Sequence, residues 1–300
     1  MKFKYRTVRL FAAALLLTPA AFNFSSCKKD SPASPQKTVN IHGTWESKGE
    51  SVPKMASVAK EDSLPENAFP WGGTVSHHLL AGETIDAWFS ELSSHRKVET
   101  FFIISPSHYG LSTQKWSLDE CAWKTAGGIV TSDAEAVEQI SKNLQVNYDP
   151  QVFPIEHGVS TLIPFIAKYF PEAKVCAIAV EGEPPMNQVD ADKLFNALAP
   201  FFRGKNRERN FLLVSTDFSH HGTEDETEAK DKRSREFFRA PTKESWIYCG
   251  CDNRPGVYTL AQFTSKDSKA CVTHYTTSYF LSGQDSNDIT SYFFSFMYDD

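Results

Sequence analysis

The chain has 300 residues and a formal net charge of −6 at pH 7, with 31 Lys and Arg against 37 Asp and Glu. The basic residues are dispersed and form no basic stripe, so we expect no nucleic-acid partner. The length suits one large domain or a tight pair, and neither an internal repeat nor a second hydrophobic span is present.

The N-terminal residues have the pattern of a secretory signal. Residues 1–9 hold four Lys and Arg and no acid. Residues 10–22 form an apolar run that is shorter than the about 20 residues of a permanent membrane helix. Two serines then precede Cys27, as at the sites where bacterial lipoproteins are cleaved and acylated. An ordinary secretory signal is the alternative, because Phe24 stands where Leu is usual.

These features predict a lipoprotein signal peptide over residues 1–27 and lipidation of Cys27. The protein would then lie in the cell envelope, periplasmic or surface-exposed, and a lipid anchor would be its only contact with the bacterial membrane. Residues 28–67 are poor in clustered apolar side chains and are expected to form a flexible tether and lead-in. Residues 68–300 are expected to form the folded domain.

Five cysteines follow Cys27, and their number bears on disulfide pairing. An odd number cannot pair completely, so at least one thiol is free or bound to a metal. In an oxidising envelope some of the others can form disulfides, and sequence does not say which. The five are Cys121, Cys176, Cys249, Cys251 and Cys271.

Apolar runs alternate with amphipathic segments from residue 72 onward. Continuous β-branched and aromatic runs predict buried strands, and the period of the intervening segments predicts helices. Ser132 and Glu135 form the pattern of a capping box at the start of one helix. The alternation predicts an α/β fold with a central, mostly parallel sheet flanked by helices. The expected strands are 72–76, 98–105, 174–180, 211–218, 270–279 and 289–298, and the expected helices 83–94, 132–144, 159–169, 190–202 and 224–239.

Side chains that can bind metals follow several predicted strands. In open α/β sheets, ligand crevices form at the carboxyl ends of the strands. A single His in a loop is usually structural, but His, Asp and Cys at several converging strand ends favour a metal site. The motifs GxGxxG, GxxxxGK[ST] and GxSxG are absent, which leaves nucleotide binding and hydrolase chemistry without support. The residues concerned are His77, His78, His108, Glu156, His157, Asp217, His220, His221, Cys249 and Cys251.

Six motifs stand in order along the chain: GGTVSHHLLAG, FIISPSHYG, IEHGVSTLIPFI, LLVSTDFSHHG, YCGCDNRPGV and ITSYFFSF. In order and spacing they resemble the Memo family, which includes AmmeMemoRadiSam system protein B. The resemblance extends from about Gly72 to the C-terminus. It implies a fold shared with the class III extradiol dioxygenases.

The resemblance also implies a metal site of two His and one Cys. The family's ligands match His77, His108 and Cys249, with His78 and Cys251 as alternatives. The dioxygenases have a carboxylate in place of the Cys. A thiolate makes the site softer, which favours Cu or Fe(II), with Zn as a further candidate.

The remaining motif residues are expected to surround the bound metal. By resemblance, His220 is the residue for acid–base work, and Asp217 would orient its imidazole. Glu156 and His157 match a Glu-His pair that would hydrogen-bond a substrate or the ligands. The predicted catalytic residues are therefore His220, Asp217, His157 and Glu156, with His221, Tyr109 and Arg254 as weaker candidates.

Two functions are compatible with such a site. The first is a metal-dependent oxidoreductase related to the dioxygenases, although fold alone does not imply ring cleavage. The second is a non-catalytic module that binds a metal, a peptide, a small molecule or a partner protein. The family's name suggests an AMMECR1-like protein and a radical SAM protein as partners.

Overall fold

The structure is a computed structural model that describes residues 39–181 and 186–299, so the predicted signal peptide and Cys27 lie outside it. Its strands are β1 (Asn40–Gly43), β2 (Phe69–Val75), β3 (Thr100–Pro106), β4 (Trp116–Ser117), β5 (Cys121–Thr125), β6 (Gly128–Thr131), β7 (Lys174–Val180), β8 (Asn210–Ser215), β9 (Phe218–Gly222), β10 (Ser268–Thr277) and β11 (Ile289–Asp299). Its α-helices are α1 (Gly82–His95), α2 (Ala134–Leu144), α3 (His157–Ser160), α4 (Ile163–Tyr169), α5 (Gln188–Leu198), α6 (Lys205–Arg209), α7 (Glu224–Arg239), α8 (Arg254–Gln262) and α9 (Ser278–Ser282). Short 3-10 helices are η1 (Glu46–Lys48), η2 (Leu79–Ala81), η3 (Ala199–Phe202) and η4 (Ser245–Tyr248).

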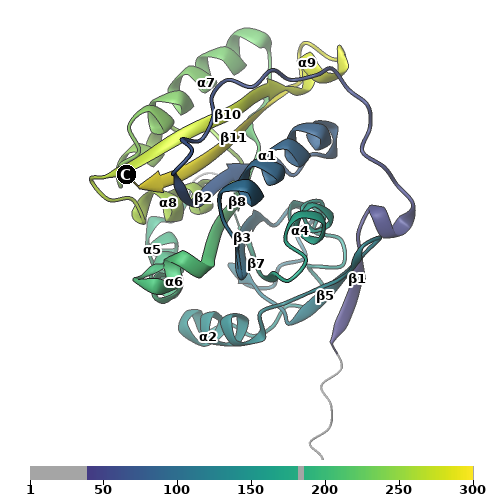
Figure 1. The fold of residues 1–300 in the computed structure, drawn as a ribbon, viewed down its shortest axis with the longest axis vertical. Coiled ribbons are helices and arrows are strands. Elements are labelled where there is room, and N and C mark those ends of the chain that lie inside the picture. The colour runs from purple at the N-terminus through teal and green to yellow at the C-terminus, as the bar shows by residue number, and fades with distance from the viewer. Residues whose placement is uncertain (1–38, 182–185, 300) are drawn as a thin grey trace, which may run out of the picture. The chain divides into compact units, whose positions relative to one another are not determined.

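The main sheet confirms the predicted α/β architecture. Its strands lie in the order β10-β11-β2-β8-β3-β7-β4, with β9 paired to β11. The central strands β2, β8, β3 and β7 are parallel, whereas β10, β11 and β4 join the sheet antiparallel to their neighbours. A smaller sheet has the order β1-β5-β6. Figure 1 shows the two sheets and the helices around them.

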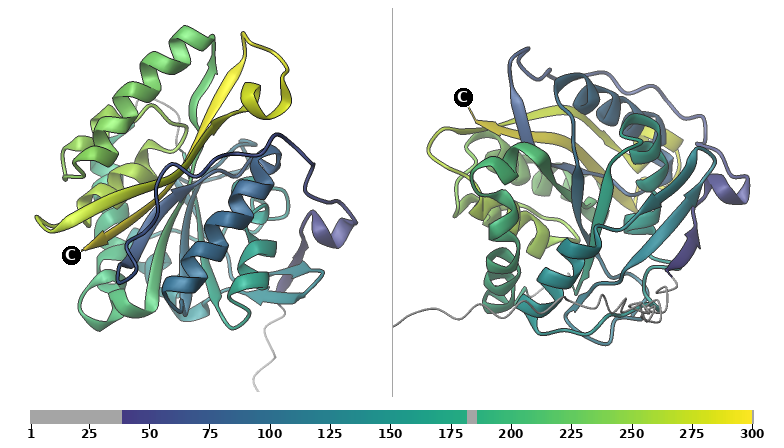
Figure 2. Two further views of the ribbon diagram at one scale, coloured as in Figure 1. Left: turned by 45° about the horizontal axis from the view of Figure 1, so that its top comes forward. Right: turned by 60° about the horizontal axis from the view of Figure 1, so that its bottom comes forward.

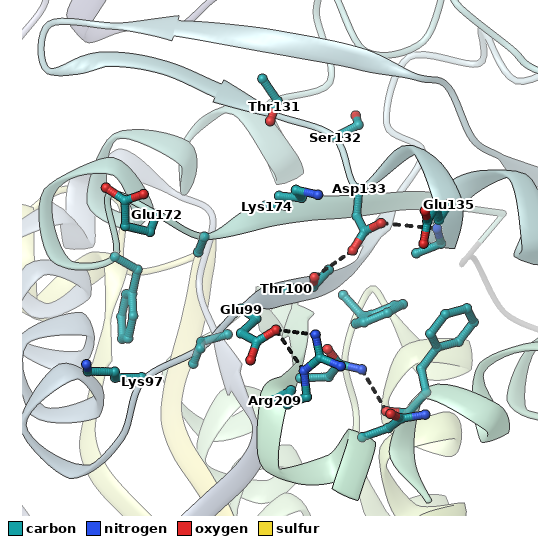
Figure 3. Close-up of a pocket in the computed structure, with 18 of the residues that line it drawn as sticks. Lys97, Glu99, Thr100, Thr131, Ser132, Asp133, Glu135, Glu172, Lys174 and Arg209 are labelled. Carbon is teal, nitrogen blue, oxygen red and sulfur yellow. Dashed lines mark hydrogen bonds and ion pairs between the residues drawn. The ribbon is translucent and has the colours of Figure 1, made fainter.

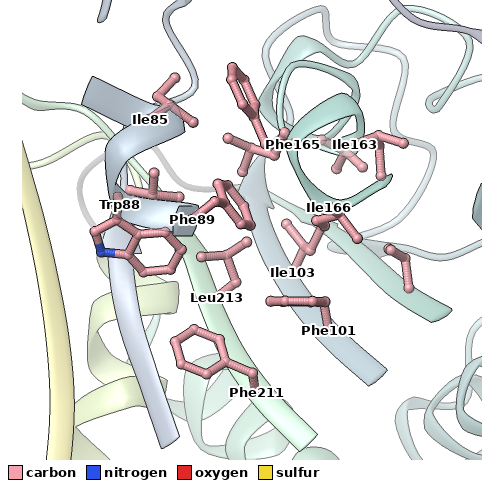
Figure 4. Close-up of a cluster of buried hydrophobic side chains, with 14 of the residues drawn as sticks. Ile85, Trp88, Phe89, Phe101, Ile103, Ile163, Phe165, Ile166, Phe211 and Leu213 are labelled. Atoms are coloured by element: carbon pink, nitrogen blue, oxygen red, sulfur yellow. The ribbon is translucent and has the colours of Figure 1, made fainter. Parts of the chain in front are cut away.

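The main sheet has a hydrophobic core on each face because alternate side chains of its parallel strands point to opposite sides. In β3, Phe101 and Ile103 pack with α1 and α4 in one core, which Figure 4 shows. Phe102 and Ile104 of the same strand pack with α2, α5 and α8 in the other core. Figure 2 shows the long strands β10 and β11 beside α7. Burial on both faces explains why these strands appear in the sequence as continuous apolar runs.

Several boundaries differ from the sequence prediction. The side chain that caps α2 is Asp133, which accepts a hydrogen bond from the backbone N–H of Ala136, so the predicted capping box at Ser132 is wrong. The helix expected over 159–169 is divided into α3 and α4. Residues 40–48 form β1 and η1, more regular structure than the scattered apolar residues indicated. Within the described residues, no helix is both long and apolar enough to cross a membrane.

Candidate functional site

The parallel strands bring the predicted site residues together at one edge of the sheet. His77 follows β2, His108 follows β3, and Asp217 follows β8. Parallel strands place their carboxyl ends on the same edge, so the loops that leave them converge. Two further loops complete the group, which we call the His–Asp cluster. Its members are His77, His108, His157, His220, Asp217 and Asp252.

Asp252 is the centre of this cluster. Its Oδ2 lies 3.4 Å from Nε2 of His77, 3.5 Å from Nε2 of His220 and 3.9 Å from Nε2 of His108. Oδ2 of Asp217 lies 3.7 Å from Nε2 of His77. Two sets of three ligand atoms each lie within 4.8 Å of one another, one from His77, His108 and His157 and one from His77, Asp217 and Asp252. Imidazole nitrogens and carboxylate oxygens therefore converge at distances suited to a shared ion.

The loop before α8 aims one oxygen of Asp252 into the cluster. Oδ1 accepts hydrogen bonds from Oγ1 of Thr216 (2.7 Å) and the backbone N–H of Asp217 (3.0 Å). The next residue, Asn253, is fully buried and caps the N-terminus of α8. Within the described residues, Oδ2 of Asp252 and Nε2 of His108 are buried without a hydrogen-bond partner. Buried polar atoms are normally paired, so these two atoms fit the coordination of a cation.

The other ring nitrogens of two histidines are fixed by neighbours. Nδ1 of His77 lies 3.0 Å from Oγ of Ser215, and Nδ1 of His108 lies 2.6 Å from Oε1 of Glu156. Glu156 also accepts hydrogen bonds from the backbone N–H groups of His108 and Gly158, both at 2.9 Å. A metal-binding His usually makes such a contact through its second nitrogen, which fixes the ring and its tautomer. Glu156 therefore positions His108.

Burial and neighbouring charges shift the pKa values of the cluster residues in different directions. Burial, and next the neighbouring Asp252, raise the pKa of Asp217 well above its ordinary value. Burial acts in the same direction on Asp252, but its contact with His108 and the nearby imidazoles of His77 and His220 hold its pKa below the ordinary value. Burial lowers the pKa of His108, yet Asp252 and Glu156 outweigh it and raise that pKa to about 9. The two carboxyls of the cluster therefore differ, because the pKa of Asp252 lies below its ordinary value and that of Asp217 lies above it.

The cluster opens to solvent on one side. The side chains of His77 and Asp252 are 2% and 4% exposed, whereas those of His220 and His157 are 32% and 37% exposed. Burial, followed by the charge on His108, lowers the pKa of His157 to about 4. Tyr109 lies at the rim, with its hydroxyl 3.0 Å from Nδ1 of His157. His157 and His220 are therefore the solvent-exposed members of the cluster.

The cysteines predicted as ligands are not among the converging ligand atoms of the described residues. Cys249 is 1% exposed and packs in the core that faces α5 and α8, and burial raises the pKa of its thiol well above the ordinary value. Neither Cys249 nor Cys251 belongs to a group of converging ligand atoms among the described residues. All five cysteines that the structure describes are free thiols.

Three other candidates, the alternative ligand His78 and the weaker candidates His221 and Arg254, make contacts with residues outside the His–Asp cluster. Nδ1 of His78 lies 2.6 Å from the hydroxyl of Tyr292, and Nδ1 of His221 lies 2.5 Å from Oδ1 of Asp288. The guanidinium of Arg254 lies over the ring of Trp246, 5.2 Å from its centroid. The sequence prediction did not include Asp252, which follows Cys251 directly. The carboxylate of the dioxygenase site was the signal that could have identified it.

A large groove lies at the opposite edge of the sheet and contains no residue of the His–Asp cluster. Its volume is about 1220 Å³, and Thr100, Lys174 and Asn210 at the amino ends of β3, β7 and β8 line it. Figure 3 shows both acidic and basic side chains there, including the ion pair between Glu99 and Arg209. The mixture of charges favours no particular ligand. The chemistry of the protein is therefore expected at the His–Asp cluster.

The sequence is similar to those of known proteins. The Memo-like protein family matches residues 58–289. A MEMO1 family protein of Pyrobaculum arsenaticum is 31% identical over 191 residues, which cover 62% of this chain and 64% of that one. A MEMO1 family protein of Pyrobaculum aerophilum is 28% identical over 183 residues, 60% of each chain. The match thus spans less than two thirds of the length of these relatives.

Proposed function

The chain belongs to the Memo-like protein family, and we propose that it is an oxidoreductase that binds Fe(II) through His77, His108 and Asp252. The observation that carries this proposal is the convergence of imidazole Nε2 atoms on Oδ2 of Asp252, at 3.4 to 3.9 Å. Distances of this size are too long for good hydrogen bonds, and an ion between the atoms would account for them.

The donor set favours iron over copper. Two imidazoles and one carboxylate with open positions are the ligands of non-haem Fe(II) oxygenases. Cu(I) prefers thiolate, and the thiol of Cys249 packs among buried apolar residues, which supports iron. The competing hypothesis is therefore a site in which Cys249 is a ligand and the ion is Cu or Zn. The variants below distinguish the two ligand sets.

The surrounding residues hold the ligands and can move a proton. Ser215 and Glu156 fix the rings of His77 and His108 through their Nδ1 atoms. His220, partly exposed and with Nε2 3.5 Å from Asp252, is placed to exchange a proton with a molecule in the opening. Iron, when bound, would supply the redox chemistry with dioxygen. The protein's own contribution is to bind, orient and deliver protons at His220.

The test of the ligand set compares two variants of one loop. The full-length chain is purified without oxygen and loaded with Fe(II), and its iron content is measured by mass spectrometry. We expect Asp252→Asn to lose one equivalent of iron relative to the wild type, and Cys249→Ser to retain it. The opposite result would restore the thiolate ligand and refute the role of Asp252.

A second measurement separates an enzyme from a metal-binding module. Nitric oxide replaces dioxygen at open positions of Fe(II) and gives a characteristic electron paramagnetic resonance spectrum. We expect this spectrum in the iron-loaded wild type and its loss in His108→Ala. Iron that binds neither nitric oxide nor dioxygen would leave a non-catalytic module for metal or partner binding.

The N-terminal pattern leads to a separate proposal about location. We propose that Cys27 is acylated and anchors the protein to a bacterial membrane, because an apolar run and two serines precede it. Cells that express the chain are given a clickable fatty acid. The label should appear on the wild type and be absent from Cys27→Ala, and equal labelling of both would refute lipidation.

A further inference from the structure

A second group of metal-binding side chains lies where the N-terminal strand β1 meets β5. The strands are parallel, with Asn40 beside Cys121 and His42 beside Trp123. Alternate residues of a strand share a face. A nitrogen of His42, a carboxylate oxygen of Asp119 and Sγ of Cys121 all lie within 4.8 Å of one another. This group shares no residue with the His–Asp cluster.

Two of the three side chains are buried and His42 is half-buried, although the group lies at the edge of the small sheet. Cys121 is fully buried and Asp119 is 5% exposed. The imidazole of His42 packs edge-on against the indole of Trp123, with ring centroids 6.4 Å apart. Its Nε2 is buried and has no hydrogen-bond partner among the described residues.

The contacts of the thiol do not explain why it lies beside an imidazole and a carboxylate. The hydroxyl of Ser132 approaches Sγ of Cys121 at 3.9 Å, a weak hydrogen bond. A buried structural Cys ordinarily packs among apolar groups alone. Here a thiol, an imidazole nitrogen and a carboxylate are buried close together, so all three can bind the same metal ion.

We propose that His42, Asp119 and Cys121 bind a Zn(II) ion that fastens β1 to the domain. One nitrogen, one oxygen and one sulfur ligand form a donor set that Zn(II) accepts, with water in the fourth tetrahedral position. Binding transfers the thiol proton of Cys121 to solvent, and no change in oxidation state occurs.

The ion would have a structural role because of where β1 lies. Within the described part of the chain, β1 is an edge strand of the small sheet and pairs with β5 alone. His42 is the ligand on β1, whereas Asp119 and Cys121 belong to the β5 side. The ion therefore bridges the start of the folded unit to a strand of the domain. Zn(II) should stabilise that junction by mass action.

Co(II) is the probe for this site because Co(II) bound to thiolate absorbs in the near ultraviolet. The full-length chain is titrated with Co(II) and then with Zn(II). We expect a thiolate band that Zn(II) removes and that His42→Ala and Cys121→Ser lack. Cys271→Ser is the matched control, since Cys271 is also buried but belongs to no ligand group among the described residues. His42→Ala keeps the test valid if Cys121→Ser does not fold.

The two metal sites can be distinguished in the same titration. His108→Ala disrupts the His–Asp cluster and should leave the thiolate band unchanged, so failure of one proposal does not imply failure of the other. Zn(II) should raise the melting temperature of the wild type by more than that of His42→Ala. Absence of the band from the wild type, or its persistence in folded Cys121→Ser, would overturn the proposal.

Discussion

Asn253 is the residue whose replacement tests how the site is held together. Its side-chain N–H groups donate to the backbone carbonyls of Ile104 and Ser215, both at 2.9 Å, and its Oδ1 accepts from the backbone N–H of Gly256 at 3.0 Å. One fully buried side chain thus joins the carboxyl ends of β3 and β8 to the N-terminus of α8. We expect Asn253→Ala to destabilise the fold and to displace Asp252.

The size of the effect follows from these three hydrogen bonds. Each buried carbonyl left without its partner costs about 1 to 2 kcal/mol, and loss of the helix cap costs about 1 kcal/mol. The free energy of unfolding should therefore fall by about 3 to 5 kcal/mol. For a domain of this size, about 2 to 4 °C is lost per kcal/mol, so the melting temperature should fall by about 6 to 20 °C.

Asn187→Ala provides the matched control. Asn187 caps α5 by accepting from the backbone N–H groups of Val189 and Asp190, but its side chain is exposed and, among the described residues, makes no bridge between strands. Its loss should cost only about 1 kcal/mol. Both variants are unfolded in urea beside the wild type. Equal losses would refute the argument that Asn253 acts as a bridge.

Three further predictions follow from single contacts. Ser215→Ala removes the hydroxyl at Nδ1 of His77 and should weaken Fe(II) binding about 10- to 100-fold in a chelator competition. Gly73→Ala places a Cβ 2.1 Å from the backbone oxygen of Ser295, so thermal unfolding should show a loss of about 3 kcal/mol or more. Burial raises the pKa of the Asp231 carboxyl, so the folded state binds this proton more tightly than the unfolded state does. The resulting contribution to the free energy of unfolding is complete below the unfolded pKa of about 3.9 and is lost as the pH rises through the folded pKa. Urea midpoints of the wild type should therefore decline over this range relative to those of Asp231→Asn, and parallel pH profiles would contradict this prediction.

The parts of the fold that sequence predicted are those in which burial dominates. β7 occupies the predicted residues 174–180 because it is buried on both faces of the sheet. α7 occupies the predicted 224–239, and its start carries a capping box between Thr223 and Glu226. In contrast, β1 is held by backbone hydrogen bonds to β5, and its Ile41 is 56% exposed. No hydrophobic pattern therefore marked it.

The candidate site was predictable where residues follow strands and less so within loops. His77, His108 and Asp217 follow β2, β3 and β8, so the parallel sheet alone brings them together. The loop before α8 has no such constraint. Which of its side chains enters the core and which enters the cluster depends on hydrogen bonds to Thr216 and Asp217, distant in sequence. The structure therefore places Cys249 in the core and Asp252 in the cluster.

The opposite pKa shifts of the two carboxyls favour a site with one ionised carboxylate. Two ionised carboxylates side by side would repel each other, and the charge of Asp252, after burial, is a cause of the raised pKa of Asp217. Asp252 then presents a single negative charge toward imidazoles that can be neutral when a cation displaces their protons. A thiolate ligand would bring the same charge. The exchange of Cys for Asp therefore leaves the ligand charge unchanged and alters its softness, so the preference for Fe(II) over Cu(I) depends on Asp252.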